Sequence, residues 1–254
     1  MGCSVMIIAR NEAENIVDCM MSCAAFATDF VIVDDFSTDD MVERIKASPV
    51  GHIARVFRHA LDGDWGQQQT YGIEQCREEW VFLIDADERC TETLAGEIAQ
   101  KVRTAPDTAY WTKRINHFAG KRVSHGPLSP DWVLRLLPQK GSHVEGRVHP
   151  KICVSVPESR LKEEMLHFTY RDWAHYESKM NFYSRLAAEK YFGEGRKSSL
   201  GFDVFVRPMV AFIKMYFFKR GFLDGSLGWM LCKQYANYTM AKYIKLDELN
   251  RKNR

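Results

Sequence analysis

Three carboxylates follow directly on an apolar run in the stretch WVFLIDADE, residues 80–88. Asp85 and Asp87 form an Asp-x-Asp motif, and Glu88 comes next. Two carboxylates at this spacing suit a hard divalent cation, whose remaining positions diphosphate oxygens can fill. The apolar run predicts a strand buried on both faces, like a parallel strand between helix layers. Since an isolated buried charge is costly, these acids must be paired, bound to a cation or in contact with water.

The Asp-x-Asp motif alone is a weak signal, because a helix-capping or surface pair of acids is the more frequent explanation. A phosphatase of the haloacid dehalogenase type also uses the motif, but on its first strand, and no matching set of partners follows here. A second acid pair, Asp34 and Asp35, ends another apolar stretch. Ligands of an open parallel sheet bind at the carboxyl ends of the strands, so both pairs are expected at one edge.

A dinucleotide-binding dehydrogenase also places an acid after its second strand. That class needs a glycine-rich turn after the first strand, and here the turn reads ARNEAEN. Hydride transfer is therefore a poor explanation of the acid pair. Asp35 is the better candidate ligand, whereas Asp34 can cap the following helix.

The first half of the chain alternates predicted strands and helices, which favours right-handed βαβ units and a mainly parallel sheet. Strands are expected at Cys3–Ala9, Phe30–Val33 and Ala54–Phe57 and over WVFLIDADE. The expected helices are one capped by Asn11 and Glu14, one after Ser37 and Asp40, one at Gly66–Arg77, and one from a Thr91 cap to Arg103.

The pattern changes after about residue 108. Strands are expected at 109–123 and 131–138, and helices at roughly 172–192, 208–220 and 227–246. The predicted fold class is α/β, with a mainly parallel central sheet flanked by helices and a helical C-terminal extension.

The composition limits the classes of protein to which this chain can belong. The 254 residues are 46% hydrophobic and 27% charged, as in an ordinary globular chain of one domain, or one domain with an appendage. The seven cysteines form no CxxC pair, and most lie in apolar runs, as reduced buried thiols do. The N-terminus has no signal-peptide pattern, and no apolar stretch is long enough to span a membrane, so we expect a cytosolic protein.

The charge is unevenly distributed. Residues 194–254 hold twelve Lys and Arg against five Asp and Glu, a net charge of +7, whereas residues 1–193 carry −5. Within this tail one apolar helical stripe is predicted, formed by Met209, Phe212, Ile213, Tyr216 and Phe217. A basic, aromatic-rich tail indicates an anionic partner, either a membrane or a nucleic acid, and a helix packed on its own domain is the alternative.

The three segments SVMIIARNEAENI, FVIVDDFSTDD and EEWVFLIDADE together resemble family 2 of the inverting glycosyltransferases, which have the GT-A fold. The segments HFAGKRVSHG, PDWVLRLLP and VEGRVHP, with the helices after them, resemble the subgroup that contains bacterial lipopolysaccharide inner-core β-1,4-glucosyltransferases. The resemblance covers nearly the whole chain. It implies a GT-A catalytic domain over 1–170, with a nucleotide-sugar half at 1–107 and an acceptor half at 108–170, and a helical extension over 171–254 that can contact a membrane.

The resemblance also implies roles for single residues. It assigns Ala9 and Glu12 to the nucleoside pocket, Asp35 to the uracil or ribose, and the Asp85-Ala86-Asp87 motif to ribose, metal and diphosphate. Mg²⁺ or Mn²⁺ and the sugar nucleotide would then complete the acids after the apolar run. His167 either completes the metal shell or is a packed core histidine. Gln67 either hydrogen-bonds the donor or faces water.

Inverting transfer needs a general base for the acceptor hydroxyl. The subgroup commonly reads Val-His-Glu where this chain has Val148-His149-Pro150, so that acid is missing. The candidate bases are Glu145, Asp131 and His149. Glu145 is favoured because it stands beside Gly146 in an expected loop, whereas Asp131 can equally end a strand and His149 can be a packed histidine.

Two arginines are further candidates. Arg135 alternates with Leu134 and Leu136 and is expected to pair with phosphate or with an acid of the sheet. Arg114 is a weaker candidate for contact with the diphosphate.

The sequence therefore predicts a metal-dependent inverting glycosyltransferase that moves a hexose, glucose from UDP-glucose, onto a lipid-linked saccharide at the inner face of the cytoplasmic membrane. No nucleic acid beyond the donor nucleotide is expected. The alternatives are a non-catalytic nucleotide-sugar-binding module of a membrane complex, and a nucleotidyl- or phosphotransferase.

Overall fold

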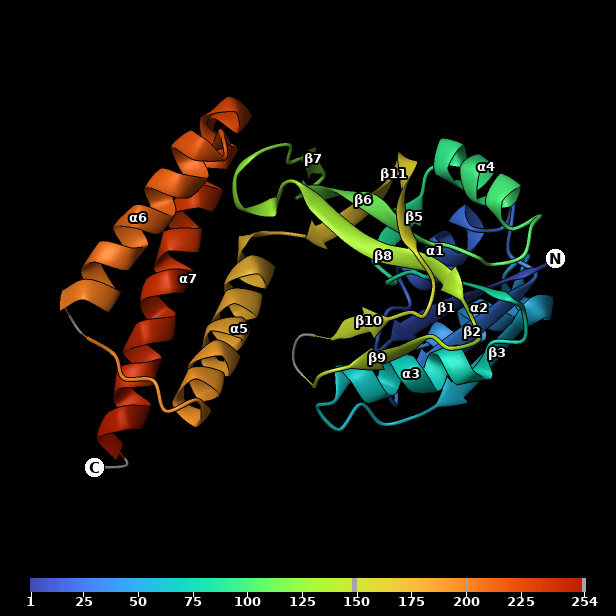
Figure 1. Ribbon diagram of the computed structural model, residues 1–254, viewed down its shortest axis with the longest axis horizontal. Coiled ribbons are helices and arrows are strands. Elements are labelled where there is room, and N and C mark those ends of the chain that lie inside the picture. Colours follow the sequence, from blue (N-terminus) through green and yellow to red (C-terminus); the bar gives the residue numbers. More distant parts are fainter. Residues whose placement is uncertain (148–149, 200, 253–254) are drawn as a thin grey trace. The chain divides into compact units, whose positions relative to one another are not determined.

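The computed structural model describes residues 1–147, 150–199 and 201–252 (Figure 1). The chain forms two compact units. Unit 1 consists of Met1–Arg114 and Asp131–His167, and unit 2 consists of Ile115–Pro130 and Phe168–Arg254. The division of function at residue 170 stays a prediction.

A mixed sheet forms the centre of unit 1, with strand order β3-β2-β1-β4-β8-β6-β11-β5. Its parallel part consists of β1 (Cys3–Ala9), β2 (Asp29–Asp34), β3 (Ala54–Arg58) and β4 (Trp80–Leu83). The antiparallel part consists of β5 (Glu88–Cys90), β6 (Ala109–Phe118), β8 (Asp131–Pro138) and β11 (Glu158–Tyr170). A separate two-stranded sheet consists of β9 (His143–Glu145) and β10 (Lys151–Cys153).

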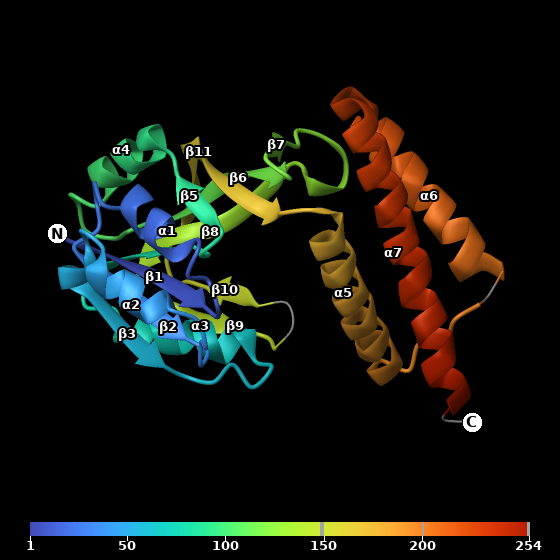
Figure 2. The same cartoon turned by 180° about the vertical axis from the view of Figure 1, so that it is seen from behind.

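Four helices cover the two faces of this sheet, namely α1 (Ile16–Ser22), α2 (Met41–Ala47), α3 (Trp65–Gln75) and α4 (Glu92–Lys101). Alternate residues of β1 point to opposite faces, as the pleat requires. Val5 and Ile7 pack in the core that holds α1, α2 and α4, whereas Met6 packs in the core that holds α3. The predicted α/β fold is confirmed, with parallel pairing among β1 to β4 and antiparallel pairing in the rest of the sheet (Figure 2).

Three local predictions are wrong. The stretch WVFLIDADE is not one strand, because β4 ends at Leu83 and the Glu88 N–H closes a turn on the Asp85 carbonyl at 2.9 Å. Asn11 does not cap a helix. It has a positive φ of 56°, and its side chain accepts from the Thr38 N–H at 2.8 Å, so it fastens one loop to another.

The cap expected before α2 is also wrong, because the Asp40 side chain makes no capping hydrogen bond. Asp39 instead accepts from the Met41 N–H at 3.3 Å and from the Ala13 N–H at 2.9 Å. The Thr91 cap of α4 is confirmed, since its hydroxyl accepts from the Leu94 N–H at 3.2 Å.

Unit 2 is mainly helical. Its helices are α5 (Trp173–Gly193), α6 (Arg207–Ile213) and α7 (Gly225–Lys252), and β7 (Lys121–Arg122) pairs with the end of β6. Figures 1 and 2 show α5 and α6 beside α7. Wider π-helical turns at Phe202–Val206 and Lys214–Phe218 flank α6. Among the helices of the described residues, none combines the length and the apolarity that a membrane crossing needs.

Candidate active site

Asp35 lies at the carboxyl end of β2, beside the end of β1. Its backbone N–H donates to the Ala9 carbonyl at 3.0 Å. Its carboxylate accepts from the Leu61 N–H at 3.0 Å and from Arg10 Nη1 at 2.9 Å. The Arg10 side chain is 63% exposed, so it can leave Asp35 for a ligand at little cost. The structure therefore brings Ala9 and Asp35 together, and their role in a nucleoside pocket stays a prediction.

The neighbouring Asp34 is buried, and its carboxylate is bonded to the chain itself. Its side chain is fully buried, accepts from the Ser37 N–H at 2.8 Å, and lies 3.5 Å from Arg58 Nε. It fixes the turn that leaves β2, so its role is structural, but it does not cap the following helix, which begins at Met41.

Asp85 and Glu88 share one buried arginine. Arg135 Nη2 lies 2.6 Å from Asp85 Oδ2 and 2.7 Å from Glu88 Oε1. Glu88 is fully buried, and it also accepts from the Asp85 N–H at 2.9 Å. Arg114 adds a second cation, at 3.0 Å from Glu88 Oε1, and its Nε donates to Asp131 Oδ2 at 2.8 Å. These contacts connect Asp85, Glu88 and Asp131 through two arginines.

The charges in this cluster compensate one another. Burial opposes ionisation of Asp85, but Arg135 and Arg114 outweigh it and lower the pKa of Asp85 to about 2. Burial raises the pKa of Glu88, because the two arginines only partly offset the loss of water around that carboxyl. Part of the positive charge that these acids require therefore comes from the chain itself. Arg135 pairs with acids of the sheet, which was one of the two expectations for it.

Asp87 and His167 form a second pair. His167 on β11 is opposite Glu88 of β5, and its Nε2 lies 3.6 Å from Asp87 Oδ1. That distance is too long for a hydrogen bond, but it suits two neighbouring ligands of one ion. The side chains are 23% and 12% exposed for Asp87 and His167. An oxygen and a nitrogen donor that face each other in a half-open position fit a divalent cation.

Glu12 reaches the Asp-x-Asp loop through two intermediate side chains. Its carboxylate accepts from Asn15 Nδ2 at 2.7 Å, and Asn15 Oδ1 accepts from Arg89 Nη2 at 3.5 Å. Arg89 Nη1 donates to the Ala86 carbonyl at 2.8 Å. The predicted residues Glu12 and Ala86 thus belong to one connected group of side chains.

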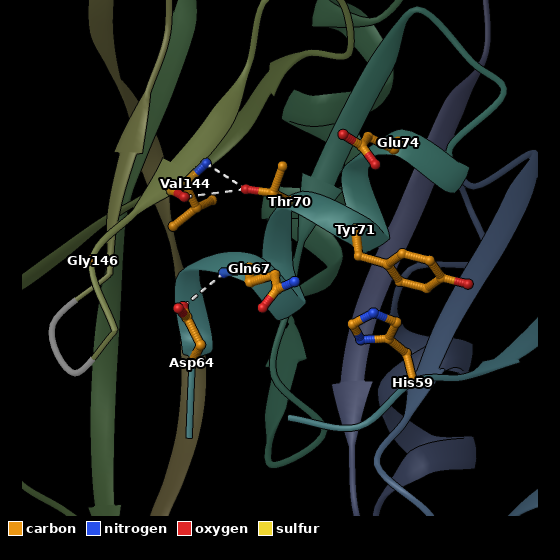
Figure 3. Close-up of a pocket in the computed structure, with 8 residues that line it drawn as sticks. All are labelled: His59, Asp64, Gln67, Thr70, Tyr71, Glu74, Val144 and Gly146. Atoms are coloured by element: carbon orange, nitrogen blue, oxygen red, sulfur yellow. Dashed lines mark hydrogen bonds between the residues drawn. The ribbon is translucent and has the colours of Figure 1, made fainter. Parts of the chain in front are cut away.

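Gln67 does not line the small cavity that Asp85 lines. It is exposed near the start of α3 and lines a cavity of about 430 Å³ with His59, Asp64, Thr70, Tyr71, Glu74, Val144 and Gly146 (Figure 3). Gln69, which was not among the predicted residues, lines a small cavity with Asp85 and Arg135. The helical period shows only that Gln67 and Gln69 lie on different faces of the helix, and it does not show which of the two faces meets Asp85.

The candidate bases occupy different surroundings. Asp131 begins β8 and belongs to the Asp85 cluster through Arg114. Glu145 is at the end of β9, with its side chain 68% exposed and 3.2 Å from His143 Nε2. His149 lies outside the described residues.

Comparison with known proteins gives one family. The model of Glycosyl transferase family 2 matches residues 4–192. The lipopolysaccharide core biosynthesis glycosyltransferase LpsC of Rhizobium meliloti is 28% identical over 258 residues, which cover 97% of this chain and 93% of LpsC. An uncharacterized glycosyltransferase of Rickettsia typhi is 25% identical over 99% of this chain and 88% of its own length.

Among solved structures, Staphylococcus aureus TarS 1–349 in complex with UDP aligns with a TM-score of 0.48 and 17% identity, covering 100% of this chain and 92% of that one. Mycobacterium tuberculosis glucosyl-3-phosphoglycerate synthase, in complex with Mn²⁺, UDP and glucosyl-3-phosphoglycerate, aligns with a TM-score of 0.36 and 19% identity over 46% of this chain and 44% of that one.

Proposed function

The chain belongs to glycosyltransferase family 2, and on that premise we propose that it moves a hexose, glucose from UDP-glucose, with inversion, onto a lipid-linked saccharide such as the lipopolysaccharide inner core. The match to the family model confirms three predictions from the sequence, namely the family, the glycosyltransferase class and the GT-A fold. The similarity to LpsC over nearly the whole chain supports the choice of acceptor class. The observation that carries the donor assignment is the position of Asp35, Asp85 and Asp87 just after the carboxyl ends of β2 and β4, the two parallel strands on either side of β1.

Asp87 and His167 are the proposed ligands of Mg²⁺ or Mn²⁺. The support is their donor chemistry and their 3.6 Å separation at the edge of the sheet. When bound, such an ion neutralises the charge that develops on the departing diphosphate.

The remaining residues of the proposed donor site hold and orient the nucleotide sugar. Asp35, fixed by the Leu61 N–H, would accept from the uracil or ribose once Arg10 moves aside. Asp85, held ionised by Arg135, would accept from a ribose hydroxyl. Because Arg135 and Arg114 fix the acids before the donor arrives, little reorganisation is needed on binding.

We assign the general base to Asp131, with Glu145 as the alternative. The sequence favours Glu145, but the contacts favour Asp131, because Arg114 joins it to the Asp85 cluster. Arg114 holds the Asp131 carboxylate by a hydrogen bond to Oδ2, and this carboxylate would take the proton of the acceptor hydroxyl as that oxygen attacks the sugar carbon. The attack would come from the face opposite the leaving diphosphate.

Unit 2 is the proposed region of contact with the membrane that holds the acceptor. Large apolar side chains are exposed along α6 and the turns beside it, including Phe205, Met209, Ile213, Phe217 and Phe218. The predicted apolar helical stripe is only partly exposed, because some of its residues pack on α7. Phe212 and Tyr216 stack on each other at 5.3 Å and pack edge-on against Trp229 of α7, so only part of the stripe faces outward.

A large exposed apolar patch on a basic unit suits an anionic lipid surface. The tail carries a net charge of +7, and Lys214 and Arg220 are exposed beside the patch. The proposed enzyme therefore works as a peripheral protein on the cytoplasmic face of the membrane, where its acceptor is anchored. The seven free cysteines suit that reducing side.

Two other functions fit a nucleotide-binding sheet edge. A non-catalytic binding module would bind the nucleotide sugar without turnover, and a nucleotidyl- or phosphotransferase would release pyrophosphate or transfer phosphate. Absence of the Val-His-Glu acid is the feature that favours the first.

A thermal-shift panel of nucleotide sugars, with and without Mn²⁺, tests the donor assignment. A ligand that binds only the folded chain raises its apparent stability, and at a hundred times its Kd the gain is about 2.7 kcal/mol. UDP-glucose with Mn²⁺ should give the largest shift, and ADP-glucose a smaller one. Equal shifts with all nucleotides, or none, would contradict the assignment.

A further inference from the structure

The hairpin of β9 and β10 carries three side chains with metal-binding atoms on one face. His143 and Cys153 are opposite each other across the strands, and Glu145 lies two positions after His143. Residues two apart and residues directly opposite share a face of a two-stranded sheet. One ring nitrogen of His143, one carboxylate oxygen of Glu145 and Sγ of Cys153 all lie within 4.8 Å of one another.

The other face of β9 holds the hairpin in place. Val144 is buried, and its backbone N–H and carbonyl bond the Thr70 hydroxyl at 2.9 and 3.1 Å. The side chains of His143 and Glu145 consequently point outward, 51% and 68% exposed. Cys153 is half-buried, whereas the other six cysteines are buried. An ion in solution can therefore reach all three donors on a supported backbone.

We propose that this face of the hairpin binds a borderline transition-metal dication, Zn²⁺ or its analogue Co²⁺, through His143, Glu145 and Cys153. A thiolate and an imidazole select such an ion against Mg²⁺, which prefers oxygen ligands. The site shares no residue with Asp87 and His167, so it is independent of the proposed catalytic metal.

The distances suit a tetrahedral ion. His143 Nε2 and Glu145 Oε1 are 3.2 Å apart, and two zinc bonds of about 2.0 Å at a tetrahedral angle place their ligands about 3.3 Å apart. A sulfur ligand would stand about 3.6 Å from the nitrogen. Since Cys153 Sγ lies within 4.8 Å of it, the sulfur has to approach by about 1.2 Å or less. Its thiol would leave the Lys151 carbonyl, now at 3.7 Å, and lose its proton as the ion binds. Water takes the fourth position.

Cobalt absorption tests this site without reference to activity. Co²⁺ added to the wild type in excess Mg²⁺ should produce a thiolate-to-cobalt charge-transfer band that saturates at one equivalent and disappears when Zn²⁺ is added. The Asp87–His167 pair contains no sulfur and cannot produce this band. In Cys153→Ser the band should be absent.

His143→Ala and Glu145→Gln should each weaken Co²⁺ binding about tenfold or more, since loss of a ligand costs at least as much as loss of its supporting contacts. His52→Ala is the matched control, because His52 is an exposed histidine on the short helix Gly51–Ile53 and should leave binding unchanged. Absence of the band in the wild type would overturn the proposal. The proposal would also be overturned if His143→Ala and Glu145→Gln gave the same band and bound Co²⁺ with unchanged affinity, because Cys153 would then bind cobalt by itself.

Discussion

Replacing Arg135 should weaken the folded state more than any other single change in the candidate active site. The Arg135 side chain is 6% exposed and lies between Asp85 and Glu88, of which Glu88 is fully buried. Arg135→Met keeps most of the side-chain volume but removes the charge. The buried carboxylate of Glu88 then loses the cation that lies closest to it.

The expected loss is about 3 kcal/mol of the free energy of unfolding. Removing one partner of a buried ion pair costs about 3–5 kcal/mol, because the other charge is left in the interior. The lower end applies here, since Arg114 stays 3.0 Å from Glu88 and the Asp85 N–H still donates to it at 2.9 Å. With a denaturant slope of about 3 kcal/mol/M, the urea midpoint should fall by about 1 M.

Two further variants complete this experiment. Glu88→Gln combined with Arg135→Met removes both charges, so the double variant should be more stable than Arg135→Met by about 1–3 kcal/mol. Arg44→Met is the control, because the Arg44–Asp40 pair is exposed and its loss should cost about 0.5 kcal/mol or less. A cost of less than about 1 kcal/mol for Arg135→Met, or a double variant no more stable than Arg135→Met, would show that Glu88 does not depend on Arg135.

Three more predictions concern the base, the membrane and acid stability. Asp131→Asn should lower the catalytic rate about a hundredfold with unchanged donor affinity, and Glu145→Gln should not; the reverse result in single-turnover assays would move the base to Glu145. The wild type should float with anionic liposomes at low salt and not at high salt, because exposed charges are screened within about 8–10 Å at physiological ionic strength. Replacing Lys214, Lys219 and Arg220 by Gln should abolish flotation, whereas the same changes in unit 1, at Lys46, Arg103 and Lys140, should not. The pKa of Asp85 lies at about 2 in the folded chain against a usual 3.8, so its stabilising contribution is complete above about pH 4 and is lost as the pH falls toward 2. The stability difference between the wild type and Asp85→Asn should therefore shrink over that range in acid denaturation, and a constant difference would disprove the assignment.

Regular elements of this fold follow from local patterns. The apolar runs predict β1, β2 and β4, and Thr91 predicts the start of α4. Asn11 could not be predicted, because its partner is the Thr38 N–H, 27 positions away. A side chain that can cap a helix can equally fasten two loops, and only the folded chain decides between them.

The same limit applies to the candidate active site. The sequence shows three acids after an apolar run, but not that Glu88 turns inward while Asp85 and Asp87 stay half-open. That difference depends on Arg135, 47 positions after Glu88, which reaches it only because β8 pairs with β4. Spacing along the chain carries no information on such a pairing. The choice between Gln67 and Gln69 likewise depends on the rotation of α3 about its axis.

UDP release measured with purified wild type and Asp87→Asn, with UDP-glucose and an extracted lipopolysaccharide-core acceptor, tests the proposed transfer most directly. The wild type should release one UDP for each sugar joined to the acceptor, and EDTA should stop the reaction until Mg²⁺ or Mn²⁺ is restored. Asp87→Asn should lose turnover and keep the urea midpoint of the wild type, because Asp87 lies at the edge of the sheet with its side chain 23% exposed. Turnover that is indifferent to EDTA and to Asp87→Asn, or release of pyrophosphate in place of UDP, would contradict a metal-dependent glycosyl transfer at this site.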